Sequence, residues 1–271
     1  MSASLSTQPP VVLTIAGSDS SCGAGAQADI KSIAAMGGYG LNALTSVVSE
    51  APGHVSLIRL LDPEIIEDQM RVLLRTFPVR AAKMGMLGGR AQVEAVAAAW
   101  RRLAPRDLPL VVDPVMVATG GGRLLEDEAV SAVVTMLLPL ATLITPNMDE
   151  AAVLVERPVR TREDMAAAAL EMAARFHTAV LLKGGHLAGD DAADVLVEHD
   201  ETLWIEGRRT PGVHTHGTGC SLSAAIATGI AKGLSLRDAV IEAKKFISRA
   251  IAQHLSWGAV HALNHLPSPA P

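Results

Sequence analysis

Aromatic side chains make up only 3% of this 271-residue sequence, and cysteine occurs only twice, at Cys22 and Cys220. Two cysteines cannot form the disulfide framework that staples small secreted domains, so the sequence predicts a cytoplasmic protein. Residues 1–10 lack the basic start and apolar core of a signal peptide, and no apolar run reaches the roughly 20 residues of a transmembrane helix. The net charge of −5 argues against nucleic-acid binding and against a polybasic membrane-binding surface.

Several motifs typical of nucleotide or metal sites are also missing. There is no GxxxxGK[ST] loop, and Gly217 and Gly219 lack the third glycine of a dinucleotide-binding loop because Leu222 stands in its place. Neither an HExxH nor a CxxC pair occurs. His214 and His216 have a spacing compatible with a metal site, but the sequence shows no partner ligands, which favours ordinary loop histidines.

Strand-like and helix-like segments alternate along the chain, in which 49% of the residues are hydrophobic. This order predicts parallel βαβ units, and therefore a three-layer α/β/α fold with a mostly parallel central sheet. We expect residues 1–271 to form one domain with flexible tails at 1–10 and 266–271. The predicted strands are 11–15, 41–48, 80–84, 110–112, 143–144 and 179–182, with a hairpin at 195–197 and 202–205. The predicted helices are 27–36, 64–74, 92–103, 128–138, a segment ending at 176 after a capping box at 161–164, 218–232 and 236–255.

The sequence at 216–220, His-Gly-Thr-Gly-Cys, runs directly into a helix of small residues. A glycine turn at a helix N-terminus presents free backbone N–H groups and the positive end of the helix dipole, which together bind phosphate. Gly217, Thr218 and Gly219 are therefore candidates for an anion-binding turn. The same position favours a thiolate at Cys220, a candidate base. An inert, buried cysteine is the alternative.

Other candidate residues follow the predicted strands, where ligands bind in open α/β sheets. The loop 17–25 contains three glycines, which let the backbone approach a ligand closely, although a generic loop explains them too. Asn147 and Glu150 suit Mg²⁺ held through water, but an N-cap by Asn147 explains the same spacing. Lys183 is a candidate phosphate ligand or the end of a strand, and Asp113 also follows a strand.

The chain resembles the hydroxymethylpyrimidine/phosphomethylpyrimidine kinases, thiamine-biosynthesis members of the ribokinase-like superfamily. The motifs that carry the resemblance extend almost from end to end, at 16–19, 23–31, 83–87, 113–118, 145–151, 182–187 and 215–225.

The resemblance implies ATP-dependent phosphorylation of the pyrimidine's hydroxymethyl group and then of the resulting monophosphate. It also implies Cys220 as the base, behind the anion-binding turn of Gly217, Thr218 and Gly219. Residues expected in the pyrimidine pocket are Gly17, Asp29, Val48, Glu50 and Met86. Asn147 and Glu150 would organise Mg²⁺, and Asp113, Asn147, Lys183 and Thr218 would lie near ATP. A homodimer is implied in the same way.

Three departures from the family pattern stand out. Ser20 and Cys22 occupy places where the family usually has proline and glycine, and His214 replaces an asparagine. The lid segment 118–121 lacks the usual lysine, which puts its phosphate contacts, and the second phosphorylation above all, in question. The alternatives are a pyridoxal/pyridoxine kinase of vitamin B6 salvage, which shares the motifs, and a non-catalytic pyrimidine-binding regulatory protein.

Overall fold

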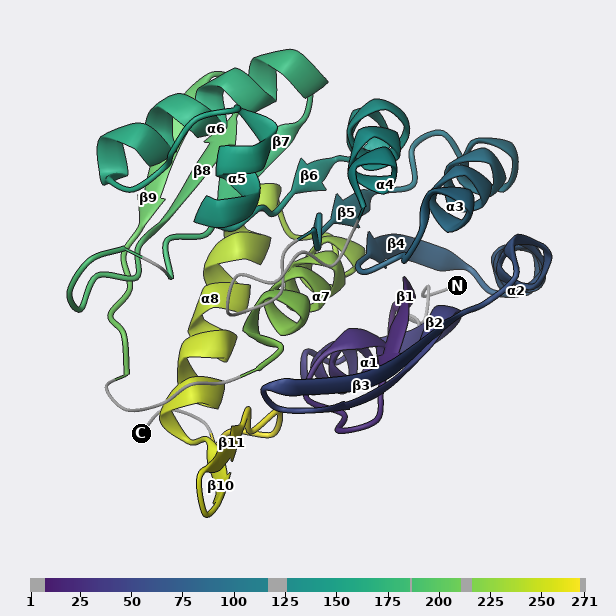
Figure 1. Cartoon of the computed structure of the whole chain (residues 1–271), viewed down its shortest axis with the longest axis horizontal. Coiled ribbons are helices and arrows are strands. Elements are labelled where there is room, and N and C mark those ends of the chain that lie inside the picture. The colour runs from purple at the N-terminus through teal and green to yellow at the C-terminus, as the bar shows by residue number, and fades with distance from the viewer. Residues whose placement is uncertain (1–7, 117–125, 186, 211–215, 269–271) are drawn as a thin grey trace, which may run out of the picture.

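The computed structural model describes residues 8–116, 126–185, 187–210 and 216–268. A nine-stranded sheet lies between two helical layers (Figure 1). Its strands run in the order β3-β2-β1-β4-β5-β6-β7-β8-β9. The bounds are β1 Val11–Asp19, β2 Tyr39–Ala51, β3 His54–Leu60, β4 Val79–Met84, β5 Leu110–Val112, β6 Leu143–Ile144, β7 Ala179–Leu182, β8 Asp194–Glu198 and β9 Glu201–Ile205.

Six neighbouring strands pair in parallel, in the order β2, β1, β4, β5, β6 and β7. Strand β3 at one edge pairs antiparallel, as do β8 and β9 at the other edge. The prediction of a three-layer α/β/α fold with a mostly parallel sheet is therefore confirmed. The predicted hairpin is β8–β9.

Helices cover both faces of the sheet and bury two apolar clusters against it. One cluster lies beneath α2, α3, α5 and α6, and the other beneath α7 and α8. Strand β1 alternates between them, since Leu13 and Ile15 belong to the first cluster and Val12 to the second. The helices are α1 Gly25–Ala35, α2 Pro63–Thr76, α3 Arg90–Leu103, α4 Asp127–Ala132, α5 Met148–Leu154, α6 Arg162–Phe176, α7 Thr218–Ala231 and α8 Leu236–Ala252.

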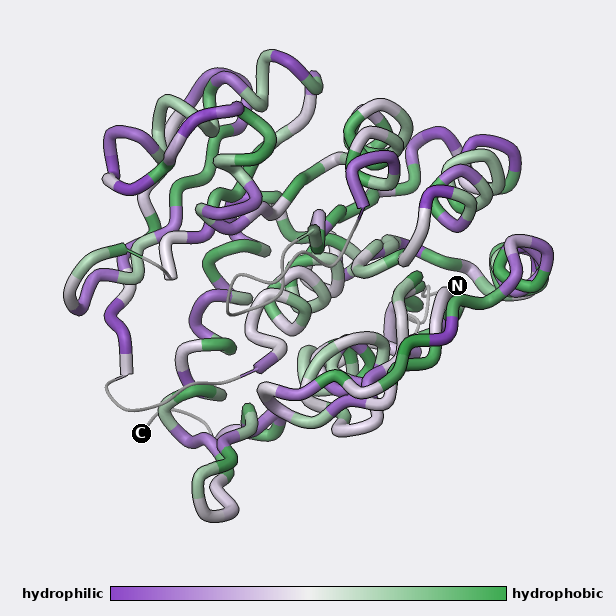
Figure 2. The backbone as a smooth tube through the Cα atoms, viewed as in Figure 1, coloured by the Kyte–Doolittle hydropathy of each residue, from purple (hydrophilic) through white to green (hydrophobic). Residues whose placement is uncertain are grey.

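Hydropathy along the backbone agrees with this layering. The central strands are mostly green in Figure 2, whereas purple segments mark the outer turns of α2 and α6. Ala, Val, Leu and Ile fill most of the core, as the scarcity of aromatic residues requires. None of the helices among the described residues combines the length and the apolar character that crossing a membrane would take.

The structure differs from the secondary structure predicted from the sequence in three places. The predicted helix 128–138 is α4 followed by a π-helical turn, Val133–Leu137, and a 3-10 turn, Leu138–Leu140, because Pro139 lacks the N–H that a continuing helix needs. Strand β3 was not predicted. The helix expected to reach 255 ends at Ala252, and the chain continues into a small hairpin.

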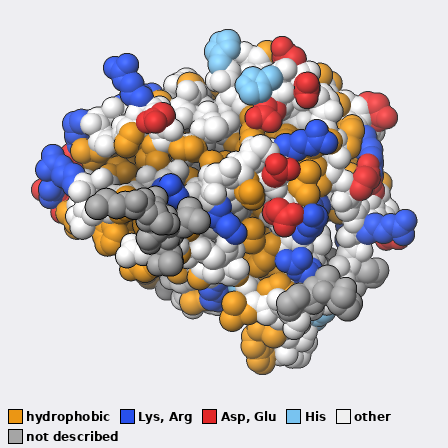
Figure 3. All heavy atoms as spheres, turned by 180° about the vertical axis from the view of Figure 1, so that it is seen from behind, with side chains coloured by type: hydrophobic (Ala, Val, Ile, Leu, Met, Phe, Trp, Pro, Cys, Tyr) orange, Lys and Arg blue, Asp and Glu red, His pale blue; other side chains and the backbone are white. Residues whose placement is uncertain are grey.

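That hairpin pairs β10, Leu255–Trp257, with β11, Val260–Ala262. It carries exposed apolar side chains, seen as orange spheres at the lower tip of Figure 3. Beyond it, the backbone of Ser268 pairs with the side chain of Gln253 through two hydrogen bonds, and the carbonyl of Pro10 accepts one from Tyr39. The described inner ends of both tails are therefore hydrogen-bonded to the domain.

Candidate active site

The candidate residues gather beyond the carboxyl ends of the parallel strands. Strand β1 lies between β2 and β4. The chain passes from β1 to β2 and β3 on one side and then crosses over to β4 on the other side, so the strand order reverses at β1. Ligands of open α/β sheets bind at such a switch point. Asp19 ends β1, Glu50 lies near the end of β2, and Asp113 and Lys183 follow β5 and β7. Parallel strand order thus brings residues distant in sequence to one edge.

Helix α7 begins in a glycine turn packed tightly against the loop after β1. Gly217 is the N-cap, with φ of 82°, a left-handed conformation that favours glycine. A Cβ there would lie 1.8 Å from the carbonyl oxygen of Gly23, so no side chain fits. Gly25, with φ of 57°, similarly has no room beside the carbonyl oxygen of Gly17. The two glycine-rich segments therefore meet, and the N-terminus of α7 opens where the predicted substrate loop lies.

Cys220 lies in the first turn of α7, partly buried, with the backbone N–H of Gly25 directed at its sulfur. Burial raises the pKa of this thiol to about 11, although the nearby charge of Lys83 opposes the shift. Burial thus opposes the thiolate that the helix N-terminus is expected to favour, and a thiolate at Cys220 remains a prediction.

Asp113 and Lys183 form an ion pair beneath the first turn of α7. The Lys183 Nζ is 2.8 Å from Asp113 Oδ1, which also accepts a hydrogen bond from Thr145 at 3.1 Å. Burial opposes the charge of Lys183, but the carboxylates of Asp113 and Glu150 outweigh it and raise its pKa. A Cβ on Gly219 would lie 2.9 Å from Lys183 Nζ, so glycine there keeps the ammonium group close to the helix N-terminus.

Asn147 and Glu150 form the capping box that opens α5. The Asn147 side chain accepts a bond from the Glu150 N–H at 2.8 Å, and Glu150 Oε2 accepts one from the Asn147 N–H at 2.9 Å. The N-cap interpretation is thus confirmed. Glu150 is also nearly fully buried, and burial raises its pKa to about 7. A buried carboxylate of this kind is stabilised by a cation, so the residues present fit a magnesium ion held through water.

The predicted pyrimidine-pocket residues fall into three places. Gly17 donates its N–H to the carbonyl of Met86 at 3.0 Å, and the carbonyl of Val48 accepts the N–H of Ser20 at 3.2 Å. The backbones of Met86 and Val48 are therefore both hydrogen-bonded to the segment 17–20. A Cβ on Gly17 would lie 2.3 Å from the hydroxyl oxygen of Ser46, which explains the glycine.

Asp29 lies below this surface and is fully buried. Its carboxylate accepts two bonds from Lys83 Nζ, at 2.9 and 2.8 Å, and one from the Thr14 hydroxyl. Burial disfavours the Lys83 charge, but Asp29 outweighs this effect and raises the pKa of Lys83 above its usual value. Because both Asp29 oxygens are engaged, its direct contact with substrate remains a prediction.

Glu50 lies close to a histidine that follows 166 positions later in the printed sequence. The Nε2 of His216 is 3.0 Å from Glu50 Oε1 and 3.4 Å from Asp19 Oδ2. Contacts with Asp19 and then Glu50 raise the pKa of His216 to about 9, so the imidazole is charged at neutral pH. The sequence showed no partners for His216, whereas the structure brings two carboxylates within reach. His214 and the lid at 118–121 lie outside the described residues.

Cys22 occupies the left-handed region, with φ of 57°, where the family pattern has glycine. A residue with a Cβ in this conformation destabilises the folded state by about 1–2 kcal/mol. Glycine avoids that strain, but its freer unfolded chain lowers the free energy of unfolding by about 0.5–1 kcal/mol. We expect Cys22→Gly to raise the free energy of unfolding by about 0.5–1 kcal/mol, measured by urea denaturation. Cys22→Ala keeps the Cβ and should give no such gain, so equal stability of the two variants would contradict this explanation.

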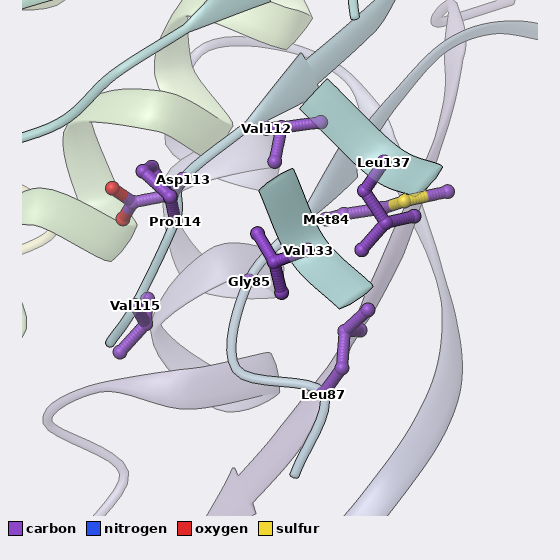
Figure 4. Close-up of a pocket in the computed structure, with 9 residues that line it drawn as sticks. All are labelled: Met84, Gly85, Leu87, Val112, Asp113, Pro114, Val115, Val133 and Leu137. Atoms are coloured by element: carbon purple, nitrogen blue, oxygen red, sulfur yellow. The ribbon is translucent and has the colours of Figure 1, made fainter. Parts of the chain in front are cut away.

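A small cavity of about 10 Å³ lies beside Asp113 and is too small to hold a pyrimidine ring. Met84, Val112, Val133 and Leu137 give it an apolar wall, and Figure 4 shows the Asp113 carboxylate pointing away from them. None of the five expected pyrimidine-pocket residues lines it. It holds at most about one water molecule.

The family model described as phosphomethylpyrimidine kinase matches residues 19–265. A hydroxymethylpyrimidine/phosphomethylpyrimidine kinase of Streptomyces coelicolor is 44% identical over 250 residues, which cover 92% of this chain and 91% of that protein. A phosphomethylpyrimidine kinase structure from Clostridium difficile aligns with a TM-score of 0.80 at 35% identity, covering 89% of this chain and 99% of the other. An ADP complex of Bacillus subtilis pyridoxal kinase aligns with a TM-score of 0.86 at 33% identity, covering 95% and 98%. These neighbours share the ribokinase-like fold, and the chain belongs to the phosphomethylpyrimidine kinase family.

Proposed function

We propose that this protein transfers the γ-phosphoryl group of ATP to the hydroxymethyl group of 4-amino-5-hydroxymethyl-2-methylpyrimidine and then to the monophosphate, giving the diphosphate for thiamine biosynthesis. The observation that carries the proposal is the meeting of two glycine-rich segments. The Gly217 turn opens α7 directly against Gly23 and Gly25, and Cys220 lies at their junction. A candidate base and a candidate anion-binding turn are thereby adjacent.

The start of α7 would stabilise the charge that develops on the transferring phosphoryl group. Backbone N–H groups of the first helical turn have no partner within the helix, and the helix dipole adds positive potential. Donors held rigidly at the place where charge develops are the main source of catalysis in phosphoryl transfer. The tight packing of Gly217 against Gly23 supplies that rigidity.

Cys220 would take the proton of the attacking hydroxyl group. The thiolate is the accepting form, and with a pKa of about 11 only a small fraction of the free protein holds it at neutral pH. The buried charge of Lys83 favours that form. An already ionised phosphate monoester needs no such base.

ATP and Mg²⁺ are the co-substrate and metal of the proposal. Bound ATP supplies the phosphoryl group, and Mg²⁺ neutralises charge on its oxygens. Asn147 and Glu150 would hold the metal through water, and Asp113 and Thr218 would lie near the nucleotide. The Lys183 ammonium, fixed by Asp113 below the helix N-terminus, would face the phosphates.

On the substrate side, the Glu50 carboxylate would accept a hydrogen bond from the amino group of the pyrimidine, beside Gly17, Val48 and Met86.

Purified protein with ATP and Mg²⁺, offered the hydroxymethylpyrimidine or its monophosphate, tests the proposal by mass analysis of the products. We expect diphosphate from both. Monophosphate as the final product would show that the lid without its lysine cannot support the second step. No ATP turnover would contradict the kinase proposal and favour a regulatory protein.

Pyridoxal phosphorylation is the second candidate activity. The specific observation in its favour is the alignment with the Bacillus subtilis pyridoxal kinase, whose TM-score of 0.86 exceeds the 0.80 of the Clostridium difficile phosphomethylpyrimidine kinase. Turnover of pyridoxal but not of the pyrimidine would establish it.

We further propose a cytoplasmic homodimer that binds neither nucleic acid nor membranes. Strand β3 supports the dimer, because it is an edge strand whose Val55, Leu57 and Leu60 side chains are all more than 40% exposed. An exposed apolar edge strand is a template for pairing with another chain, and exposed apolar patches mark interaction sites. The net charge of −5 supports the absence of nucleic-acid partners.

Leu57→Glu should therefore convert the dimer to a monomer, because a buried interface would have to accept a carboxylate. Light scattering coupled to size exclusion would show a halving of mass. Leu170→Glu is the matched control, since Leu170 is 42% exposed on α6 and Leu57 is 46% exposed. A wild-type monomer, or dissociation of both variants, would contradict the β3 interface.

A further inference from the structure

His216 joins three separate segments of the candidate site. It directly precedes Gly217, and its Nε2 lies between Glu50 at the end of β2 and Asp19 at the end of β1. This nitrogen is buried, yet it makes no well-directed hydrogen bond to either carboxylate. The interaction is an ion pair shared between two acids.

The carboxylates of Asp19 and Glu50 differ in how many hydrogen bonds they accept. Asp19 accepts bonds from the backbone N–H groups of Ser21, Gly23 and Ala24 and from the Ser21 hydroxyl. Burial opposes the Asp19 charge, but His216 and these donors prevail and lower its pKa to about 2. Asp19 is therefore a fixed anchor within the glycine-rich loop.

Glu50 is fixed at its backbone but not at its carboxylate. Its N–H donates to the Ser20 hydroxyl at 2.8 Å, and that hydroxyl donates back to the Glu50 carbonyl at 2.7 Å. Among the hydrogen bonds and ion pairs of the described residues, its carboxylate takes part in one, the ion pair of Oε1 with His216. The side chain is 16% exposed. Oε1 is thus held by the His216 imidazole, whereas Oε2 has no hydrogen bond or ion pair with a described residue.

We propose that His216 is a positioning residue, anchored on Asp19, which holds Oε1 of Glu50 so that Oε2 is oriented to accept an N–H of the aminopyrimidine edge. The inference rests on the proposed function. Because His216 is bonded to Gly217, the turn that binds phosphate also sets the orientation of the substrate-recognising carboxylate. Substrate recognition by Glu50 and phosphate binding at the Gly217 turn are thereby linked through the peptide bond between His216 and Gly217.

The same three side chains have a geometry that could hold a divalent cation, since their ligand atoms lie within 4.8 Å of one another. The Asp19 oxygens argue against this alternative, because they already accept hydrogen bonds from Ser21, Gly23 and Ala24. A charged imidazole also has no lone pair for a metal. The test must nevertheless distinguish the two.

Calorimetric binding of the hydroxymethylpyrimidine without ATP is the test, with ATP binding measured separately. His216→Ala should weaken pyrimidine binding by about 10- to 100-fold, because Glu50 loses the charged group that fixes its carboxylate, while ATP affinity stays within about twofold. His216→Gln keeps an N–H donor and should recover most of the loss. His199→Asn is the control, because His199 is 91% exposed in a turn.

A double-mutant comparison separates positioning from general damage to the loop. If His216 acts through Glu50, His216→Ala should have little further effect on pyrimidine binding in a Glu50→Gln background. Unchanged binding by His216→Ala, or an equal loss in both backgrounds, would overturn the inference. Loss of wild-type binding on EDTA treatment with recovery on adding Zn²⁺ would overturn it in favour of a metal site. Wild-type protein that binds pyridoxal but not the pyrimidine would instead refute the proposed function.

Discussion

Replacing Cys220 with alanine is expected to slow the first phosphorylation by about 10²- to 10⁴-fold and to leave the second much less affected. The attacking alcohol must lose a proton, whereas a phosphate monoester is largely ionised at neutral pH because its second pKa is about 6. Single-turnover rates with the hydroxymethylpyrimidine and with its monophosphate would measure the two effects.

The raised pKa of Cys220 adds a dependence on pH. The thiolate is the active form, and its fraction rises up to tenfold per pH unit below the pKa of about 11. The rate of the first step should therefore rise from pH 6.5 to 8.5 in the wild type and stay flat in Cys220→Ala. Cys22→Ala controls for loss of a thiol. Equal loss in both steps would mean that Cys220 supports geometry and is not the base.

Lys83→Met is expected to lower the free energy of unfolding by about 3–5 kcal/mol, the usual cost of leaving one partner of a buried ion pair uncompensated. Lys83 and Asp29 have no exposed side-chain surface, and two bonds of 2.9 and 2.8 Å join them. The midpoint and slope of urea denaturation would measure the loss.

Two further variants show whether the pair is responsible. Lys83→Met combined with Asp29→Asn removes both charges, so its cost should be smaller than the sum of the single losses. Arg90→Ala breaks an exposed ion pair with Glu94 and should remain close to the wild type. If Lys83→Met were as stable as Arg90→Ala, the buried pair would contribute nothing measurable.

Local sequence patterns were sufficient to predict the central sheet and most helices. Buried β-branched runs such as Leu110–Val112 and capping residues such as Thr161 act within a few positions, so the sequence displays them. Strand β3 was missed because its stability depends on pairing with β2 and its side chains are exposed, which leaves no buried pattern. The π-helical turn Val133–Leu137 likewise arises from packing and from Pro139, not from periodicity.

The candidate site was predicted where a single segment carries it, as at Gly217–Cys220 and in the capping box of Asn147 and Glu150. Contacts between distant segments were not visible. Lys83 was placed in a strand and in a family motif, but its ion pair was not predicted because its partner Asp29 lies 54 positions away. The effect of burial on Cys220 was not visible either, since the sequence shows the helix N-terminus but not the burial that raises the pKa of the thiol.

The central claim is best tested by a competition in which equal concentrations of the hydroxymethylpyrimidine and pyridoxal are offered to the wild-type protein with limiting ATP and Mg²⁺. The ratio of phosphorylated products reports the ratio of the two kcat/KM values directly. We expect phosphorylated pyrimidine to predominate in the wild type and the preference to shrink in Glu50→Gln. A predominance of pyridoxal phosphate in the wild type would contradict the account.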